Sequence, residues 1–309
     1  MPTVSLFLFQ GTGRLLFGPH PERARADAEL LLMHLLRTGR AWLIAHSDVE
    51  IGADQWDPYF AMLQRRRNGE PIQYITGQQE FYGLPFHVTP DVLIPRPETE
   101  HLVEKVLQLA ATPEGSVRGH DFSRAESRTK RDGALAPAGF PRILDVGTGS
   151  GAIAVALAHH LLDAQISALD ISPSALEVAS GNAERNGVQD RVRFLQSDLL
   201  TSVADERFEM VVSNPPYVPA ADRESLSVEV REHEPALALF AGEDGLDVYR
   251  RLIPEAFGVL EPGGFLLMEI GFGQSAAVAT LLADAGFGRI DFVPDLQSIP
   301  RVAYAQRPV

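Results

Sequence analysis

Apolar residues recur three and four positions apart through the first part of the chain. In the segment RADAELLLMHLL, Ala28, Leu31, Leu32 and Leu35 fall on one face of a helix, and DPYFAMLQRRR repeats the pattern more briefly. The second segment ends in three arginines, which either form a solvated helix end or meet an acidic partner. The pattern therefore predicts a small helical domain, which we assign to residues 1–75.

A short alternating stretch follows the helices. The segment QEFYGLPFHVTPDVLI predicts two short strands joined by a Gly-Leu-Pro turn, and we expect a β-hairpin linker over residues 76–96. The next segment, PRPETEHLVEKVLQLA, predicts a helix with Pro97 and Glu98 early and Lys105 late, as the helix dipole favours. Residues 112–141 are rich in Gly, Ser, Arg, Pro and Ala, which predicts a flexible insertion.

From residue 142 onward the chain alternates between strand-like and helix-like segments. Short apolar runs such as RILDV, QISALD and FEMVVSN alternate with helical segments such as GAIAVALAHHLL and GLDVYRRLIPEAFGVL. This alternation predicts a mostly parallel sheet with helices on both faces. The last two strands, in RIDFVPD and VAYAQRP, have no helix between them, which predicts an antiparallel strand at the end. We therefore expect an α/β domain over residues 97–309.

The composition narrows the range of partners. A formal net charge of −14 argues against unspecific adhesion to nucleic acid or to anionic membranes, which needs a basic field. The chain has no cysteine, which excludes disulfides, thiolate metal sites and a cysteine nucleophile. No apolar run is long enough to span a bilayer, and we expect a cytoplasmic protein. His159 and His160 have no acidic partner at metal-ligand spacing, so we expect no metal.

A glycine-rich segment lies between the first strand and the first helix of the α/β domain. In LDVGTGSGAIA, Gly147, Gly149 and Gly151 allow a tight turn and a close approach of a ligand to the backbone. The segment also fits the looser dinucleotide pattern through Ala152. The glycines alone therefore leave two other interpretations open, a plain glycine turn and a site for a nicotinamide cofactor.

Three acidic residues follow successive strands and favour S-adenosylmethionine. Asp145 lies just before the first glycine. Its negative charge would repel a pyrophosphate but would attract the ammonium group of S-adenosylmethionine. Asp170 ends the second strand and can accept hydrogen bonds from ribose hydroxyls, and Asp198 ends the third and can accept one from the adenine amino group. All three acids therefore lie at the carboxyl ends of the strands, which is the edge of an open α/β sheet where ligands bind.

The fourth strand delivers the segment SNPPYV to the same edge. The side-chain oxygen of Asn214 and the carbonyl of Pro215 can accept both hydrogens of a planar amino or amide group, while Pro216 stiffens the backbone. The ring of Tyr217 can lie over the flat group and exclude water. A stiff proline turn capped by the asparagine is the alternative. Glu269, at the end of LLMEIG, either faces the cofactor crevice or makes a cap or loop contact.

These motifs, in this order and spacing, resemble the PrmC/HemK family of protein-(glutamine-N5) methyltransferases. The similarity covers roughly residues 21–307 and includes PIQYITGQQEFYGLPFHVTPDVLIPRPETE, ILDVGTGSGAIA, SNPPYV, EPALALFAGEDGLDVYRRLI and LLMEIG. It implies a seven-stranded Rossmann-like class I methyltransferase domain with a small N-terminal helical domain and a β-hairpin linker. The stretch 112–141, the first twenty residues, and Ser298 and Pro300, where Gly and Asp are expected, depart from the family pattern.

The resemblance also implies an activity and a set of site residues. It implies methyl transfer from S-adenosylmethionine to the glutamine of the Gly-Gly-Gln tip of class 1 peptide chain release factors. Apart from the resemblance, we expect a monomer that binds neither nucleic acid nor membrane. The residues carried over as catalytic are Asn214, Pro215 and Tyr217. Those carried over as substrate-binding are Asn214, Pro215, Pro216, Tyr217, Arg96, Glu98 and Thr99. Those expected to bind the cofactor are Asp145, Gly147, Thr148, Gly149, Gly151, Asp170, Ile171, Asp198, Leu199 and Asn214.

Three other functions compete with this one. An amino-group methyltransferase acting on adenine or cytosine shares the NPPY motif, but it needs a basic groove and a base-flipping pocket, which the acidic balance disfavours. A non-catalytic binding protein predicts a damaged NPPY segment, and the segment is intact. A nicotinamide oxidoreductase explains the glycines and leaves SNPPYV unexplained.

Overall fold

The computed structural model describes residues 2–111 and 141–309, so almost all of the expected insertion lies outside the described residues. The chain divides into two compact units. The first comprises Met1–Gln78, Val88–Pro90 and Arg223–Pro235, and the second comprises the remaining residues. The first unit is helical, and the second contains a seven-stranded sheet.

The helical unit begins earlier than the apolar pattern predicted. A helix occupies Val4–Leu15, within the first twenty residues, and the side chain of Thr3 caps it by accepting a hydrogen bond from the backbone of Leu6. The α-helices of this unit are α1 (Val4–Leu15), α2 (Ala24–Leu36), α3 (Arg40–Ala45), α4 (Trp56–Arg67), α5 (Ile72–Thr76) and α9 (Val228–His233), and its short 3-10 helices are η1 (Pro21–Arg23) and η2 (Ala53–Gln55).

The core of the helical unit contains the residues that the helical spacing selected. Leu31 and Leu32 of α2 are fully buried, and Tyr59 of α4 is buried beside them. The Tyr59 hydroxyl donates a hydrogen bond to the Ala28 carbonyl over 3.0 Å, which satisfies its polar end. Leu35 is partly buried at the edge of the same cluster. The helical prediction for this segment is therefore confirmed.

The arginines that end α4 are only partly solvated. Arg66 is 3% exposed, and its Nε donates to Asp27 over 2.6 Å, while another nitrogen bonds Glu229 near the start of α9. Arg65 pairs with Glu70 at 2.5 Å. The solvated helix end is therefore wrong for Arg66, which tethers two segments of the helical unit that lie far apart in the sequence.

The sheet of the second unit has the order β5-β4-β3-β6-β7-β9-β8, and it is parallel except for the antiparallel pairings of β9 with its two neighbours. The predicted fold class and the antiparallel final strand are confirmed. The strands are β3 (Arg142–Val146), β4 (Gln165–Asp170), β5 (Val192–Gln196), β6 (Phe208–Ser213), β7 (Leu260–Glu269), β8 (Gly288–Pro294) and β9 (Pro300–Gln306).

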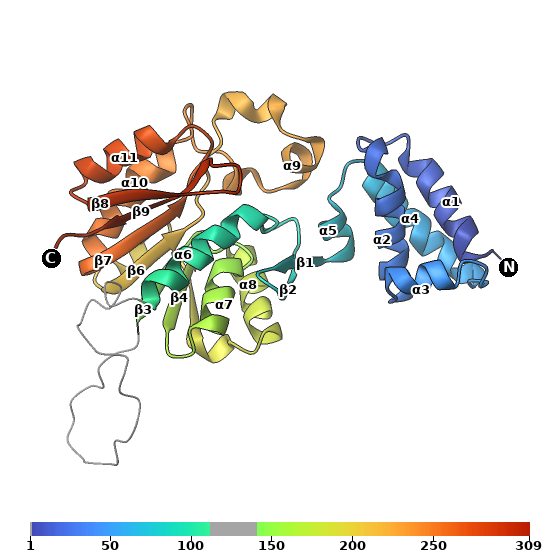
Figure 1. The fold of residues 1–309 in the computed structure, drawn as a ribbon, viewed down its shortest axis with the longest axis horizontal. Coiled ribbons are helices and arrows are strands. Elements are labelled where there is room, and N and C mark those ends of the chain that lie inside the picture. The colour runs from blue at the N-terminus through green and yellow to red at the C-terminus, as the bar shows by residue number, and fades with distance from the viewer. Residues whose placement is uncertain (1, 112–140) are drawn as a thin grey trace, which may run out of the picture. The chain divides into compact units, whose positions relative to one another are not determined.

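Helices cover both faces of this sheet (Figure 1). Helices α6, α7 and α8 pack on one apolar cluster, and α10 and α11 pack on a second cluster across the sheet. Their bounds are α6 (Glu100–Ala110), α7 (Ala152–His160), α8 (Pro173–Arg185), α10 (Asp247–Val259) and α11 (Ser275–Asp284). The 3-10 helices are η3 (Pro97–Thr99), η4 (Gln189–Arg191), η5 (Thr201–Val203), η6 (Ala220–Ser225) and η7 (Ala236–Ala238).

The predicted hairpin forms, but its turn lies one step earlier than expected. Strand β1 is Gln78–Phe81 and β2 is Leu84–His87, so Leu84 and Pro85 belong to the second strand. The turn is made by Tyr82 and Gly83, which both have positive φ. A Tyr-Gly pair gives the left-handed backbone that a tight hairpin turn requires, and Pro at the second position of β2 needs no N–H there.

Candidate active site

The glycine segment forms a left-handed loop between β3 and α7. Gly147, Gly149 and Gly151 have φ of 72°, 55° and 80°. A Cβ atom added to either of the first two would meet no heavy atom of the described residues within 4 Å. A Cβ on Gly151 would lie 3.0 Å from Cβ of Ala179 in α8. The first two glycines therefore leave open space beside the backbone, and the third permits close packing of two helices.

Asp145 lies directly beneath this loop and is fully buried. Its Oδ2 accepts hydrogen bonds from the Thr148 hydroxyl at 2.6 Å and from the Ala154 backbone at 3.2 Å. Its Oδ1 is buried and has no hydrogen-bond partner within the described part of the chain. Burial raises the pKa of Asp145 to about 7. The orphaned oxygen makes this carboxylate a candidate partner for a cationic group.

Asp170 holds the same loop from the end of β4. Its Oδ2 accepts from the backbone N–H of Gly149 at 2.8 Å, and its Oδ1 accepts from Ser172 at 2.9 Å. Each oxygen keeps a second lone pair for a further donor. Ile171 is 46% exposed directly beside it, which leaves an apolar surface for a ligand.

Asp198 follows β5 and is more exposed than the other two carboxylates. Its Oδ2 accepts from Arg251 at 2.8 Å, and half of the side-chain surface is exposed. The next residue, Leu199, has φ of 48° and is partly buried against α10 and its neighbours. All three acids lie where sequence reasoning expected them, at the carboxyl ends of adjacent parallel strands.

The SNPPYV segment begins where β6 ends, beside the glycine loop. The Ser213 hydroxyl donates to the Val146 carbonyl at 2.7 Å, which ties the end of β6 to the end of β3. Pro215 is buried, while Asn214 and Pro216 are half-buried. The sheet therefore fixes the position of the segment at its first residue.

A hydrogen-bonded chain of four side chains lies behind this segment. Asn214 Nδ2 donates to Thr99 Oγ1 at 3.0 Å, and the Thr99 hydroxyl donates to Glu269 Oε2 at 2.6 Å. The Tyr217 hydroxyl donates to the other oxygen, Oε1, at 3.1 Å. Glu269 is 2% exposed and ends β7. Sequence reasoning left its role open, and the only signal was an acidic residue closing an apolar strand.

The surroundings stabilise this arrangement. The Tyr249 hydroxyl donates to the Glu269 carbonyl at 2.8 Å, and Gln274 donates to the Tyr217 carbonyl at 3.0 Å. Burial raises the pKa of Glu269, and the two hydroxyl donors oppose that shift. Burial first and the Glu269 charge second raise the pKa of the Tyr217 hydroxyl, so it stays protonated as a donor.

The residues expected at the mouth of the site differ in how far they are exposed to solvent. Thr99 is 4% exposed, so its hydroxyl serves Glu269 and Asn214 rather than an open surface. Glu98 is exposed and Arg96 is half-buried, and the positive charges of Arg96 and Arg301 lower the pKa of Tyr217. These two arginines therefore add a positive field beside the NPPY segment.

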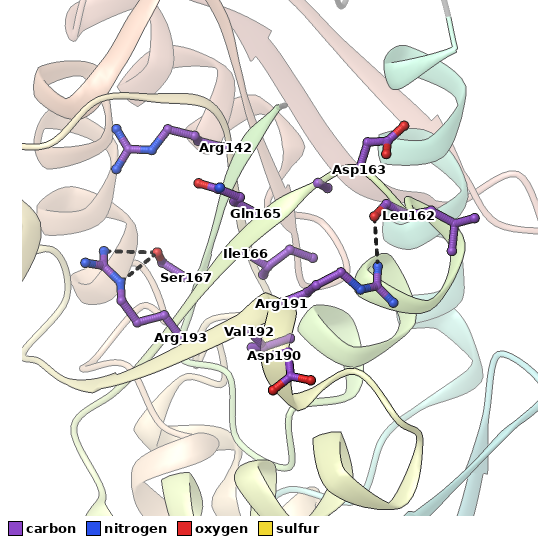
Figure 2. A pocket seen from close by; sticks show the side chains of 11 residues that line it. Arg142, Leu162, Asp163, Gln165, Ile166, Ser167, Asp190, Arg191, Val192 and Arg193 are labelled. Atoms are coloured by element: carbon purple, nitrogen blue, oxygen red, sulfur yellow. Dashed lines mark hydrogen bonds between the residues drawn. The ribbon is translucent and has the colours of Figure 1, made fainter. Parts of the chain in front are cut away.

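A cavity of about 450 Å³ lies at the opposite, amino-terminal ends of β3, β4 and β5 (Figure 2). Its three arginines already have partners. Arg142 pairs with Glu206 at 2.5 Å, Arg193 bonds Ser167 at 3.0 Å, and Arg191 donates to carbonyls that follow α7, including that of Leu161 at 3.2 Å. The predicted site residues gather at the other edge of the sheet, and the candidate active site is there.

Comparison with known proteins identifies the family. The PrmC N-terminal domain model matches residues 13–77, and the Methyltransferase small domain model matches residues 134–231. The chain is 43% identical over 285 residues to the release factor glutamine methyltransferase of Koribacter versatilis, covering 92% of this chain and 91% of that one. The chain belongs to the release factor glutamine methyltransferase family.

Further relatives agree with this assignment. The family member from Geobacter sulfurreducens is 40% identical and covers 91% of this chain and 89% of its own length. Among solved structures, the hMettl16 catalytic domain in complex with a 3′UTR hairpin has a TM-score of 0.52 at 16% identity, covering 82% of each chain. This likeness supports the methyltransferase fold, and the PrmC/HemK resemblance is confirmed.

No helix of the described residues is long and apolar enough to cross a membrane. No group of three or more His, Asp or Glu side chains in that part of the chain has the arrangement of a metal site.

Proposed function

We propose that this protein transfers a methyl group from S-adenosylmethionine to the side-chain amide of the glutamine in the Gly-Gly-Gln motif of peptide chain release factors. The observation that carries the proposal is the Asn214 amide. Its nitrogen donates a hydrogen bond to the buried Thr99 hydroxyl, which leaves its oxygen to accept a hydrogen bond from a substrate N–H. The names of relatives at about 40% identity supply the substrate class.

The residues at the sheet edge fit the cofactor. The orphaned Oδ1 of Asp145 suits its ammonium group, and the open space beside Gly147 and Gly149 suits close approach to the backbone. The remaining lone pairs of Asp170 suit ribose hydroxyls, and exposed Ile171 suits an apolar contact with adenine. S-adenosylmethionine, when bound, supplies an electrophilic methyl group. Thr148, Gly151, Asp198, Leu199 and Asn214 complete the proposed set.

The NPPY segment provides the acceptors that an amide nitrogen needs. An amide nitrogen is a poor nucleophile because its lone pair is delocalised. The oxygen of Asn214 and the carbonyl of Pro215 accept its two hydrogens, orient its lone pair and stabilise the positive charge that develops on it. The ring of Tyr217 lies over the flat group and excludes water, and Pro216 keeps the backbone rigid. Arg96 and Glu98 contact the substrate around the glutamine.

The proposal extends to the setting of the reaction. Class 1 release factors are the partners, the enzyme acts as a monomer, and it works in the cytoplasm on translation termination. Residues 1–75 bind the substrate, residues 76–96 form the linker, and residues 97–309 carry the methyltransferase chemistry. Methylation of adenine or cytosine amino groups is not favoured, because the relatives at about 40% identity are named as release factor glutamine methyltransferases and not as nucleic-acid methyltransferases.

Replacement of Asn214 by Ala tests the proposal. We expect Asn214→Ala to lose about 100-fold or more in turnover, as when one transition-state hydrogen bond is removed, and much less in affinity for S-adenosylmethionine, to which Asn214 adds one contact among many. Methylation of an unmodified release factor measures the first quantity, and calorimetry measures the second. Wild-type turnover in this variant would remove Asn214 from the mechanism.

A further inference from the structure

Glu269 is a buried carboxylate that the proposed methyl transfer does not itself require. Burying an ionised group is costly unless it is well hydrogen-bonded, so its presence beside the NPPY segment needs an explanation. The charged groups that act on it are Arg301, which favours the ionised form, and Glu98, which opposes it. Its two carboxyl oxygens meet the hydroxyls of Thr99 and Tyr217.

The hydrogen bonds around Glu269 have a definite direction. The Thr99 hydroxyl donates to Oε2 over 2.6 Å and the Tyr217 hydroxyl donates to Oε1 over 3.1 Å, so both carboxyl oxygens of Glu269 act as acceptors. Threonine has a single hydroxyl proton. That proton is therefore used on Glu269, and the Thr99 oxygen can only accept from its other neighbour. That neighbour is the Asn214 amide, 3.0 Å away.

This direction decides which end of the Asn214 amide faces the substrate. If the amide were reversed, its oxygen would face the lone pairs of Thr99 and the contact would be repulsive. The NH2 group must therefore point at Thr99, and the oxygen must point the other way. A substrate nitrogen that carries hydrogens needs that oxygen as an acceptor, whereas an NH2 group in its place would repel it.

We propose that Glu269 and Thr99 are positioning residues, which together hold Asn214 with its amide oxygen toward the substrate nitrogen. The same carboxylate holds the Tyr217 hydroxyl, so one buried group sets both ends of the NPPY segment. The inference rests on the proposed function for the identity of the substrate. The orientation itself applies to any planar amide or amino acceptor.

Three substitutions test the chain of donors. Thr99→Ser keeps the hydroxyl, and we expect it to retain most of the turnover. Thr99→Val keeps the shape and removes the acceptor, and we expect a loss of about 10- to 100-fold in kcat, because Asn214 is then free to reverse. Glu269→Gln keeps the volume but supplies an NH2 donor, which lets Thr99 donate to the Asn214 oxygen instead. We expect it to lose turnover like Thr99→Val.

A double variant separates positioning from a merely structural role. If Thr99 acts through Asn214, then Thr99→Val has little further effect on kcat once Asn214 is already Ala. Full additivity, or equal turnover in Thr99→Val and Thr99→Ser, would overturn the proposal. Calorimetric affinity for S-adenosylmethionine and the thermal midpoint are measured for every variant. We expect the affinity to stay near the wild-type value in Thr99→Ser and Thr99→Val, and the thermal midpoint to fall only in Thr99→Val, where buried Glu269 loses a donor.

The design keeps two failures apart. The variants are assayed on an unmodified release factor and on adenine- and cytosine-containing oligonucleotides. If the wild type methylates only an oligonucleotide, the proposed function fails, and the ranking of Thr99→Ser above Thr99→Val on that substrate still decides the inference. If the wild type methylates the release factor and the ranking is absent, only the inference fails.

Discussion

Asn182 of α8 offers a direct test of how the hairpin and the glycine loop are held together. This side chain is fully buried. Its Oδ1 accepts from the His87 backbone at 2.7 Å, and its Nδ2 donates to the carbonyls of His87 and Ser150, both at 2.9 Å. One amide therefore joins the last residue of β2 to the loop that precedes α7. We predict that Asn182→Ala loosens both segments.

The size of the effect follows from the number of bonds. The substitution removes three hydrogen bonds at a net value of about 1 kcal/mol each, so the local cost is about 3 kcal/mol. Two of these bonds join the hairpin, at about 2 kcal/mol together, and each 1.4 kcal/mol is a factor of ten. Local opening of the hairpin should therefore become about 30-fold more frequent. Asn186, one turn later, is the matched control. It is half-buried, and its Nδ2 donates to the Pro85 carbonyl at 3.0 Å and to the backbone carbonyl of Asn182 at 2.9 Å. Only the first of these bonds reaches the hairpin, so Asn186→Ala should weaken the hairpin by about 1 kcal/mol or less.

Hydrogen exchange read by mass spectrometry is the appropriate assay. Both tryptophans lie in the helical unit, so their fluorescence reports on that unit and not on the hairpin. We expect the peptides that contain β2 and the glycine loop to exchange much faster in Asn182→Ala, and the β2 peptide to exchange at most about fivefold faster in Asn186→Ala. Equal exchange in the two variants would refute the assignment of this amide as the link.

Two further predictions concern the cofactor loop. Gly149→Ala and Gly151→Ala both impose a strained backbone of about 1 kcal/mol or more. Calorimetry should show that the first mainly weakens cofactor affinity, and thermal melting should show the larger loss for the second, where the new Cβ meets Ala179; the reverse order would contradict the packing. Burial raises the pKa of Asp145 from 3.8 to about 7, so the folded state favours the protonated form of this side chain. Its contribution to the free energy of unfolding is therefore fully present below about pH 4 and is lost as the pH rises through 7. Without cofactor, Asp145→Asn should therefore gain stability relative to the wild type between pH 5 and pH 8, by at most about 4 kcal/mol, while its cofactor affinity falls; a pH-independent difference in thermal midpoint would show that Asp145 does not titrate in this way.

The sequence pattern was informative wherever local order decides structure. Alternating strands and helices predicted the parallel sheet, and the lack of a helix between RIDFVPD and VAYAQRP predicted the antiparallel β9. The acids Asp145, Asp170 and Asp198 could be placed together because the ends of parallel strands share one edge. Even the departure at Ser298 has a structural counterpart, since this residue has φ of 63°, a conformation that suits the expected glycine.

Contacts between distant segments could not be predicted in the same way. Thr99 and Glu269 are 170 positions apart, and their bond depends on α6, which follows Thr99, packing against β7. Arg66 is the middle residue of a run of three arginines, and its bonds to Asp27 and Glu229 distinguish it from its solvated neighbour Arg67. Helix α1 was missed because its apolar residues, such as Phe9 at 74% exposed, lie on both faces and hide the helical period.

The central claim is tested most directly by locating the transferred methyl group. Purified protein is incubated with an unmodified release factor and S-adenosylmethionine carrying a deuterated methyl group, and the tryptic peptides are sequenced by tandem mass spectrometry. A release factor with Ala in place of the Gly-Gly-Gln glutamine is the control. The account predicts one labelled methyl group on the side chain of that glutamine and none in the control. Label on another residue, or no label while the cofactor binds, would contradict it.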